Sequence, residues 1–242
     1  MEVNFQMNGI QINYLSPLKK WRLLDLRNLM KACNYEASYI SFVKMILRLE
    51  KKRMVGSAYD PFTRRKYLYL TKEGNNYLGG DDSPPSISKE TFVHDAKVVE
   101  LILELMKLNC FYGFELEHEI SAKSNFKVGY KICPDAILMG EKKKKKFKLA
   151  LEMELTRKTK SKYLGKISQY LDSSYYDYVF YLFQNKGVLE SYKATTEDKF
   201  GVQASKKILF GLNENLLSRS FDLAETNVHF KEKEIKIHEL FN

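Results

Sequence analysis

Three acidic residues in the second half of the chain have the types and spacing to hold a divalent cation. Asp135 follows Pro134 at the head of an apolar segment, and Glu152 and Glu154 interrupt a second one, LALEMEL. Alternate residues of a strand share a face, so the two glutamates point the same way, and a hairpin brings Asp135 beside them. Such carboxylates repel one another unless they hold a cation, and hard oxygen ligands suit Mg²⁺ or Mn²⁺. We therefore expect a site that activates water for phosphodiester hydrolysis.

The same acids have a second interpretation as ordinary surface residues. Acidic side chains on an exposed strand face commonly pair with lysines and contribute little. Against this, Glu152 and Glu154 alternate with Leu151, Met153 and Leu155, which are expected to face the core. The alternation favours the metal site.

Cationic residues follow the acids directly in the run TRKTKSKY. Lys158 belongs to this run, and Lys166 lies further along the basic helix predicted from about residue 158 to 171. A lysine near a metal can orient the attacking water or neutralise developing charge, which is the role expected of one of these two. Lys160 and Lys162 are candidate phosphate contacts.

Two other groups of residues are expected to be mainly structural. The lysine run 142–146 at a predicted hairpin tip keeps a sheet edge soluble, although phosphate contact is open to it. Tyr163 and Tyr170 could stack a base or attack a phosphate, but their inward register on the basic helix favours packing.

The elements of residues 1–80 are predicted to be helices followed by a hairpin. Pro17 is expected at the first position of a short helix, and Asp25 can cap the helix LRNLMKAC. MVGSAYDPFTRRKYLYLT predicts two strands around its Asp-Pro turn, and TKEG begins a last helix. The run 38–53 predicts a helix whose apolar stripe is Ile40, Val43, Ile46, Leu47 and Leu49.

This order is that of a winged helix-turn-helix, in which the third helix enters the major groove and the hairpin follows the phosphates. Lys44 and Arg48 on the third helix, with Arg64, Arg65 and Lys66 in the wing, are then the candidate DNA contacts. A module for dimerisation or protein docking is the alternative.

The remaining chain is expected to form a second domain. Gly-Gly-Asp-Asp-Ser-Pro-Pro-Ser from residue 79 has linker composition, so we expect domains at 1–80 and 89–242 with a linker at 81–88. The second domain opens with a helix over 89–108, and its order of helix, three strands, helix and strand implies a mixed α/β sheet. The strand YDYVFYLF should pair parallel with the strand that carries Glu152, through a right-handed crossover.

The composition is compatible with DNA as the partner. The net charge is +10, from 40 Lys and Arg against 30 Asp and Glu, which favours polyanions. No apolar run approaches a membrane span and the start lacks a signal peptide, so a cytoplasmic protein without membrane insertion is expected. The cysteines lie far apart and are expected to be buried reduced thiols, without a zinc site or disulfides.

The motifs resemble a known nuclease fold. Pro134-Asp135, then Glu152-Met-Glu154 and LTRK, resembles the PD-(D/E)xK nuclease superfamily, the fold of many restriction enzymes. More closely, YLYLTKEGNNYL, His94-Asp95 and PDAIL…ALEMELTRKTKSKY, in that order, are similar to the replication-relaxation family. That family is similar to the MOBC class of plasmid mobilisation relaxases, which nick DNA at a transfer origin. The resemblance covers most of residues 15–185.

The resemblance implies roles for particular residues and a restriction-endonuclease-like second domain. Asp135, Glu152 and Glu154 would be the catalytic metal ligands, with Glu117 or Glu119 as a fourth acid. The sequence departs from the pattern at one position, because Glu154 stands where the superfamily has its final lysine. The role of that lysine would pass to Lys158 or Lys166, or be absent.

Three functions are compatible with these features. The first is a metal-dependent endonuclease or relaxase that nicks double-stranded plasmid or mobile-element DNA at an origin-type site. Its single-stranded product and other relaxosome proteins would be its further partners. The second is a DNA-binding regulator of plasmid replication whose nuclease domain is inactive, although the three intact acids argue against lost activity. The third is a restriction or repair nuclease.

Overall fold

The computed structural model divides into two compact units, Met1–Val99 and Glu100–Asn242. The residues that it describes are 9–79, 87–124, 132–219 and 221–241. The predicted linker therefore lies largely outside the described residues, and the boundary between the units falls inside helix α5 (Phe92–Leu105). The composition-based boundary near residue 80 differs because the start of α5 packs within the first unit. Phe92 lies edge-on to Tyr67 at 5.7 Å, and Lys97 pairs with Asp60 at 3.9 Å.

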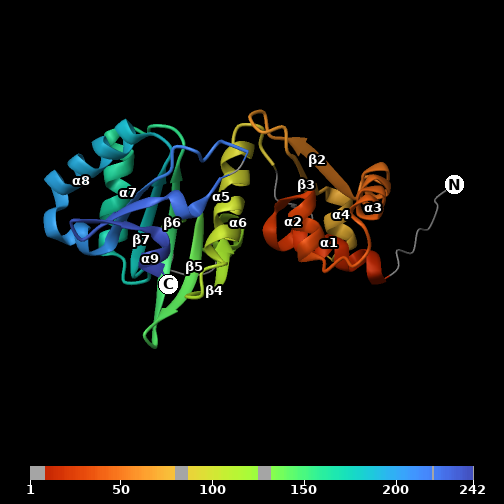
Figure 1. The fold of residues 1–242 in the computed structure, drawn as a ribbon, viewed down its shortest axis with the longest axis horizontal. Helices are drawn as coiled ribbons and strands as arrows, with labels where there is room; N and C mark the ends of the chain where they lie inside the picture. Colours follow the sequence, from red (N-terminus) through yellow and green to blue (C-terminus); the bar gives the residue numbers. More distant parts are fainter. Residues whose placement is uncertain (1–8, 80–86, 125–131, 220, 242) are drawn as a thin grey trace. The chain divides into compact units, whose positions relative to one another are not determined.

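The first unit has an antiparallel sheet of strand order β1-β3-β2, accompanied by short helices (Figure 1). The predicted hairpin is present, as is the Asp25 cap, whose carboxylate accepts from the N–H groups of Arg27 and Asn28. The elements are α1 (Gly9–Trp21), β1 (Leu23–Asp25), α2 (Leu26–Ala32), α3 (Tyr39–Lys51), β2 (Val55–Tyr59), β3 (Lys66–Leu70) and α4 (Lys72–Tyr77).

Two predictions about these helices are wrong in detail. Helix α1 begins at Gly9 and runs through Pro17, although an interior proline removes one N–H and its ring crowds the carbonyl four residues earlier. On α3, Ile40 and Leu47 are 67% and 52% exposed. The buried residues of α3 are Phe42, Ile46 and Leu49, so the face that packs is narrower than the apolar stripe in the sequence.

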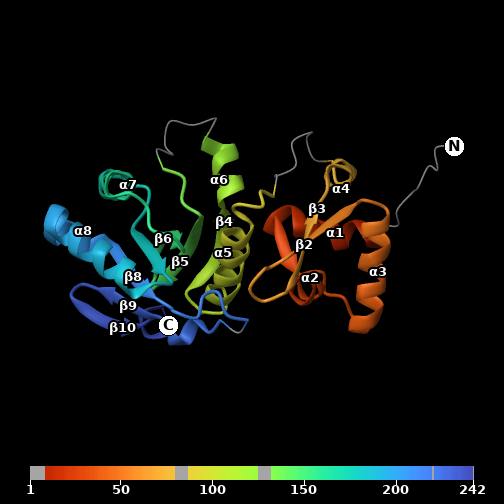
Figure 2. The same ribbon diagram turned by 90° about the horizontal axis from the view of Figure 1, so that it is seen from above.

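The second unit is built on one mixed sheet of strand order β10-β9-β8-β7-β6-β5-β4 in the described residues (Figures 1 and 2). The pairs β6–β7 and β7–β8 are parallel, as expected for the first of them, and the other pairs are antiparallel. After α5, the elements are β4 (Phe111–Leu116), α6 (Glu117–Ser124), β5 (Ala136–Lys142), β6 (Lys145–Glu154), α7 (Lys160–Asp172), β7 (Tyr178–Phe183), α8 (Lys186–Lys207), β8 (Ile208–Leu212), η1 (Leu223–Glu225), β9 (Asn227–Phe230), β10 (Lys233–Lys236) and α9 (Ile237–Phe241).

The mixed α/β class is confirmed, and β7 is followed by α8, a helix of 22 residues. Its sequence has weak helical periodicity, and its buried residues are only Leu189, Tyr192, Thr196 and Ala204. Gly201 interrupts it with φ of 50° and ψ of −135°, a backbone conformation that glycine adopts readily. Tertiary packing therefore stabilises this helix more than its own pattern does.

Helices α7 and α8 lie together on one side of the sheet (Figure 2). Their buried side chains, among them Ile167 and Tyr192, join one core with Ala150, Val179 and Phe183 from the strands beneath. Because strand residues alternate between faces, this is the face that also carries Glu152 and Glu154. The two glutamates therefore lie under helices and not on an open surface.

Among the described residues, no helix combines the length and apolar character needed to cross a bilayer. The cysteines are free thiols; Cys110 is buried as expected, whereas Cys33 and Cys133 are only half-buried. Burial raises the pKa of the Cys33 thiol to about 11, so this thiol is protonated at neutral pH.

Candidate active site

The β5–β6 hairpin places Asp135 beside the strand that carries Glu152 and Glu154. Asp135 immediately precedes β5, and its N–H donates to the carbonyl of Leu151 at 3.1 Å. Its Oδ2 accepts from the N–H of Met153 at 2.7 Å. These bonds to the residues on either side of Glu152 fix the Asp135 carboxylate beside it. Glu154 follows two positions along β6, on the same face.

Glu152 is fully buried and held by two residues of α7. The Nζ of Lys166 lies 2.6 Å from its Oε1 and 2.7 Å from its Oε2, and the Tyr170 hydroxyl donates to Oε1. Burial, followed by repulsion from Asp135, raises the pKa of Glu152 to about 7, although the bonds from Lys166 and Tyr170 act in the opposite direction. Glu152 therefore changes charge near neutral pH.

Glu154 ends β6 and is paired with Lys158, four residues further along the chain. The Nζ of Lys158 donates to Oε1 of Glu154 at 2.7 Å, and only 3% of Glu154 is exposed. Burial raises the pKa of Glu154 despite this partner. For Lys158, burial lowers the pKa, but the hydrogen bond to Glu154 and the negative charges of Glu154, Glu152 and Asp135 together outweigh it. The pKa of Lys158 is therefore raised and its ammonium stays charged.

Tyr181 is a member of the site that the sequence did not single out. It lies on β7 directly across from Glu152, and 1% of it is exposed. Within the described residues, its hydroxyl has no hydrogen-bond partner. Burial, then the charges of Glu152 and Glu154, raise its pKa well above 10. The sequence predicted the parallel pairing of β6 and β7 but not its register, and the register places Tyr181 opposite Glu152.

The two tyrosines of α7 have packing roles in this fold. Tyr163 stacks on Tyr192 with ring centroids 3.9 Å apart, and its hydroxyl donates to the Tyr192 carbonyl at 2.5 Å. Tyr170 is fully buried and bound to Glu152, and burial raises its pKa well above 10. A phenol that resists ionisation is a poor nucleophile, in line with the packing role expected from the inward register.

The donor chemistry of the site suits Mg²⁺ or Mn²⁺, but its present arrangement is that of ion pairs. Within residues 9–79, 87–124, 132–219 and 221–241, no three acidic, histidine or cysteine side chains are grouped as metal ligands. Lys166 and Lys158 neutralise Glu152 and Glu154 instead. Cation binding would need at least one lysine to release its carboxylate.

The other predicted residues of the second unit are placed as follows. Glu119 accepts from the N–H of Leu116 at 3.0 Å and so satisfies a backbone donor at the start of α6, while Glu117 is exposed. Lys160 and Lys162 are exposed in the first turn of α7. They follow the Lys158 segment and are free to contact an anion in solvent.

The candidate DNA contacts of the first unit divide into two groups. Lys44 and Arg48 on α3 and Arg64 in the β2–β3 turn are exposed. Lys66 forms an ion pair with Glu50 at 2.7 Å, and Arg65 lies 3.8 Å from Asp25. The exposed cations can approach a phosphate without breaking an internal pair, whereas Lys66 and Arg65 cannot.

Comparison with known proteins adds no family: no protein-family model matches the chain, and no curated protein matches it. The resemblance to PD-(D/E)xK nucleases and relaxases therefore stays a prediction, and function has to be inferred from the site itself.

Proposed function

We propose that this chain is a metal-dependent DNA endonuclease of the relaxase type, which nicks plasmid or mobile-element DNA at a specific site such as a transfer origin. The observation that carries the proposal is the buried Glu152 carboxylate, set beside Asp135 and Glu154 and faced by two lysines. A buried carboxylate beside other acids destabilises a fold, and carboxylates with strongly raised pKa values cluster at functional sites.

The first unit would bind the DNA as a winged helix. The support is the order α1, α2, α3 and then the β2–β3 hairpin, with Lys44 and Arg48 exposed along α3. Arg64 would be the main DNA contact of the wing, because Lys66 and Arg65 are held in ion pairs with Glu50 and Asp25.

Mg²⁺ or Mn²⁺ held by Asp135, Glu152 and Glu154 would supply an activated water and charge stabilisation at a phosphodiester. One lysine would then act on the phosphate. Lys158 has a side chain that is 41% exposed, against 27% for Lys166, and is the better placed to turn toward a strand in solvent. Lys166, fixed on α7 beside Tyr170, would favour the charged form of Glu152 and orient its carboxylate.

A DNA-binding regulator without nuclease activity is the second candidate. The observation that favours it is the pairing of both glutamates with lysines, which satisfies their charge without a cation. In that case the site would be a buried ionic network that stabilises the second unit.

A plasmid-nicking assay separates these candidates. Supercoiled plasmid with an origin-type site is incubated with the protein and Mg²⁺ or Mn²⁺, in parallel with Asp135→Asn and the control Glu141→Gln. Glu141 is an exposed acid on the same hairpin. We expect nicking by the wild type and the control but not by Asp135→Asn.

Binding to duplex DNA without nicking by any of the three proteins would favour the regulator. Cleavage of every plasmid irrespective of sequence would favour a restriction or repair nuclease.

A further inference from the structure

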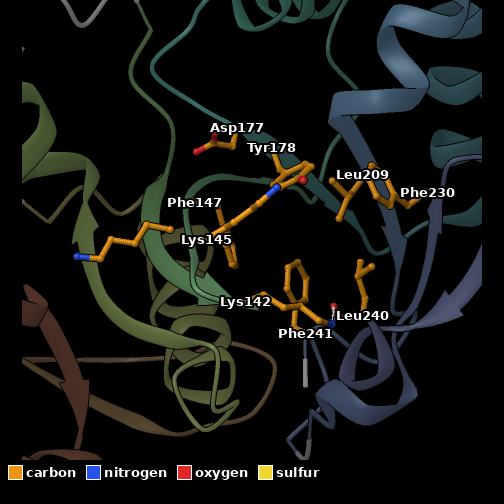
Figure 3. A pocket seen from close by; sticks show the side chains of 10 residues that line it. Lys142, Lys145, Phe147, Asp177, Tyr178, Leu209, Phe230, Leu240 and Phe241 are labelled. Atoms are coloured by element: carbon orange, nitrogen blue, oxygen red, sulfur yellow. Dashed lines mark hydrogen bonds between the residues drawn. The ribbon is translucent and has the colours of Figure 1, made fainter.

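A pocket of about 410 Å³ opens between the β5–β6 hairpin and the C-terminal helix α9 (Figure 3). Its walls are mostly aromatic and its rim is mostly cationic. The walls include Phe147, Tyr178, Phe230 and Phe241, and the rim includes Lys142 and Lys145.

This pocket is separate from the acidic site. Phe147 and Glu152 are five positions apart on β6, so their side chains point to opposite faces of the sheet. Phe147 also lies near the start of the strand, whereas Glu154 ends it, a separation of about 20 Å at the usual rise per residue. A ligand in the pocket would therefore not touch the acids.

The aromatic walls suit a flat ring. Tyr178 meets Phe147 and Phe230 edge-on at 6.0 and 5.8 Å, and the rings of Phe147 and Phe241 are nearly parallel with centroids 6.4 Å apart. The four aromatic side chains are among those that surround the pocket in Figure 3. Aromatic side chains arranged in this way bind planar bases by stacking, without regard to sequence.

The rim supplies charge of the sign that a phosphate needs. Lys145 shares a face with Phe147, and its side chain extends across the pocket toward Tyr178 (Figure 3). Lys142 donates to the Leu240 carbonyl at 2.7 Å and so holds its ammonium at the mouth. Asp177 is the one acid of the lining, and its Oδ2 accepts from the N–H of Lys148 at 2.7 Å. A base with an exocyclic amine could donate to the same carboxylate.

We propose that this pocket binds a nucleotide, with the base between the aromatic side chains and the phosphate at Lys142 and Lys145. The nucleotide would come either from an unpaired position of a single DNA strand or from a free mononucleotide. The inference does not depend on the nuclease chemistry, because it uses none of the acidic residues. If both proposals hold, the pocket would retain the single strand that nicking releases.

Fluorescence anisotropy with the full chain tests the site. The probe is a labelled 12-nucleotide single strand, measured in EDTA so that cleavage plays no part, beside the same strand with abasic positions. The variant Lys142→Glu/Lys145→Glu is compared with Lys143→Glu/Lys144→Glu, which makes the same charge change on the same hairpin outside the pocket lining. Leu240→Trp, which narrows the mouth, is a second variant that leaves charge unaltered.

We expect at least a tenfold loss of affinity for Lys142→Glu/Lys145→Glu and for Leu240→Trp, and at most a threefold loss for the control pair. The abasic strand should bind about tenfold more weakly than the intact one. If dAMP competes with the labelled strand, the ligand is a free nucleotide. If dAMP does not compete, the ligand is a single strand. Equal losses in the two lysine pairs, or equal affinity for the abasic strand, would overturn the proposal.

Photocrosslinking locates the base directly. A strand with 5-iodouracil is irradiated on the full chain, and the adducts are mapped by mass spectrometry. Adducts on Tyr178 or Phe230 are expected, because these rings line the pocket. Adducts confined to residues 9–79 would place single-strand binding in the first unit and refute the site.

Discussion

The buried carboxylate of Glu152 makes the stability of this protein depend on pH in a definite direction. Its pKa is raised from 4.5 to about 7 in the folded chain, so between these values the folded state holds a proton that the unfolded state has lost. The stabilisation is fully present below pH 4.5 and is lost as pH rises through 7. We expect Glu152→Gln, which cannot ionise, to remove this dependence.

The magnitude follows from the two pKa values. Each tenfold change in proton affinity is worth about 1.4 kcal/mol, so a pKa moved from 4.5 to about 7 corresponds to roughly 3 kcal/mol. Most of this stabilisation, about 2.5 kcal/mol, is lost as the pH rises from 5 to 8. The side chain of Lys166 is 27% exposed, so water can solvate its ammonium once Glu152 is replaced. The loss of this ion pair therefore has little effect on how stability changes with pH.

Urea denaturation followed by circular dichroism at pH 5 and pH 8 measures the difference. The free energy of unfolding of the wild type should fall by about 2.5 kcal/mol more than that of Glu152→Gln over this interval. Glu141→Gln, at an exposed position, serves as the control and should behave as the wild type. The same fall in Glu152→Gln as in the wild type would refute the assignment of this titration to Glu152.

Three further predictions concern other parts of the chain. Lys97→Met should lower the free energy of unfolding by about 3 kcal/mol in denaturation experiments, because it leaves the fully buried Asp60 carboxylate without its ion-pair partner. A decrease in the free energy of unfolding of less than about 1 kcal/mol would contradict this. Tyr181→Phe should leave the free energy of unfolding unchanged or raise it by about 1 kcal/mol, because the hydroxyl that it removes is buried without a hydrogen-bond partner in the described structure. A clear loss of stability in denaturation experiments would show that the hydroxyl is hydrogen-bonded. Lys44→Ala/Arg48→Ala should weaken duplex DNA binding, and the slope of log affinity against log salt concentration should become shallower by about two, one for each lost phosphate contact. Anisotropy from about 50 to 200 mM salt measures this slope, and an unchanged slope would exclude α3 from the interface.

The sequence by itself determined those features that depend on neighbours along the chain. The alternation in LALEMEL places Glu152 and Glu154 on one strand face, because the side-chain period of a strand is two. The Asp25 cap is equally local, since its carboxylate reaches N–H groups only two and three residues ahead. The parallel pairing of β6 and β7 followed from the helix between them.

Only the tertiary structure decided what surrounds these residues. Lys166 and Tyr170 are four apart and share a face of α7, but the packing of α7 on the sheet is what sets that face over Glu152. The register of β6 on β7 brings in Tyr181, and register depends on contacts between distant segments. The unit boundary inside α5 has the same origin, because Phe92 and Lys97 pack on side chains about 25 to 40 residues earlier in the chain, which no local pattern contains.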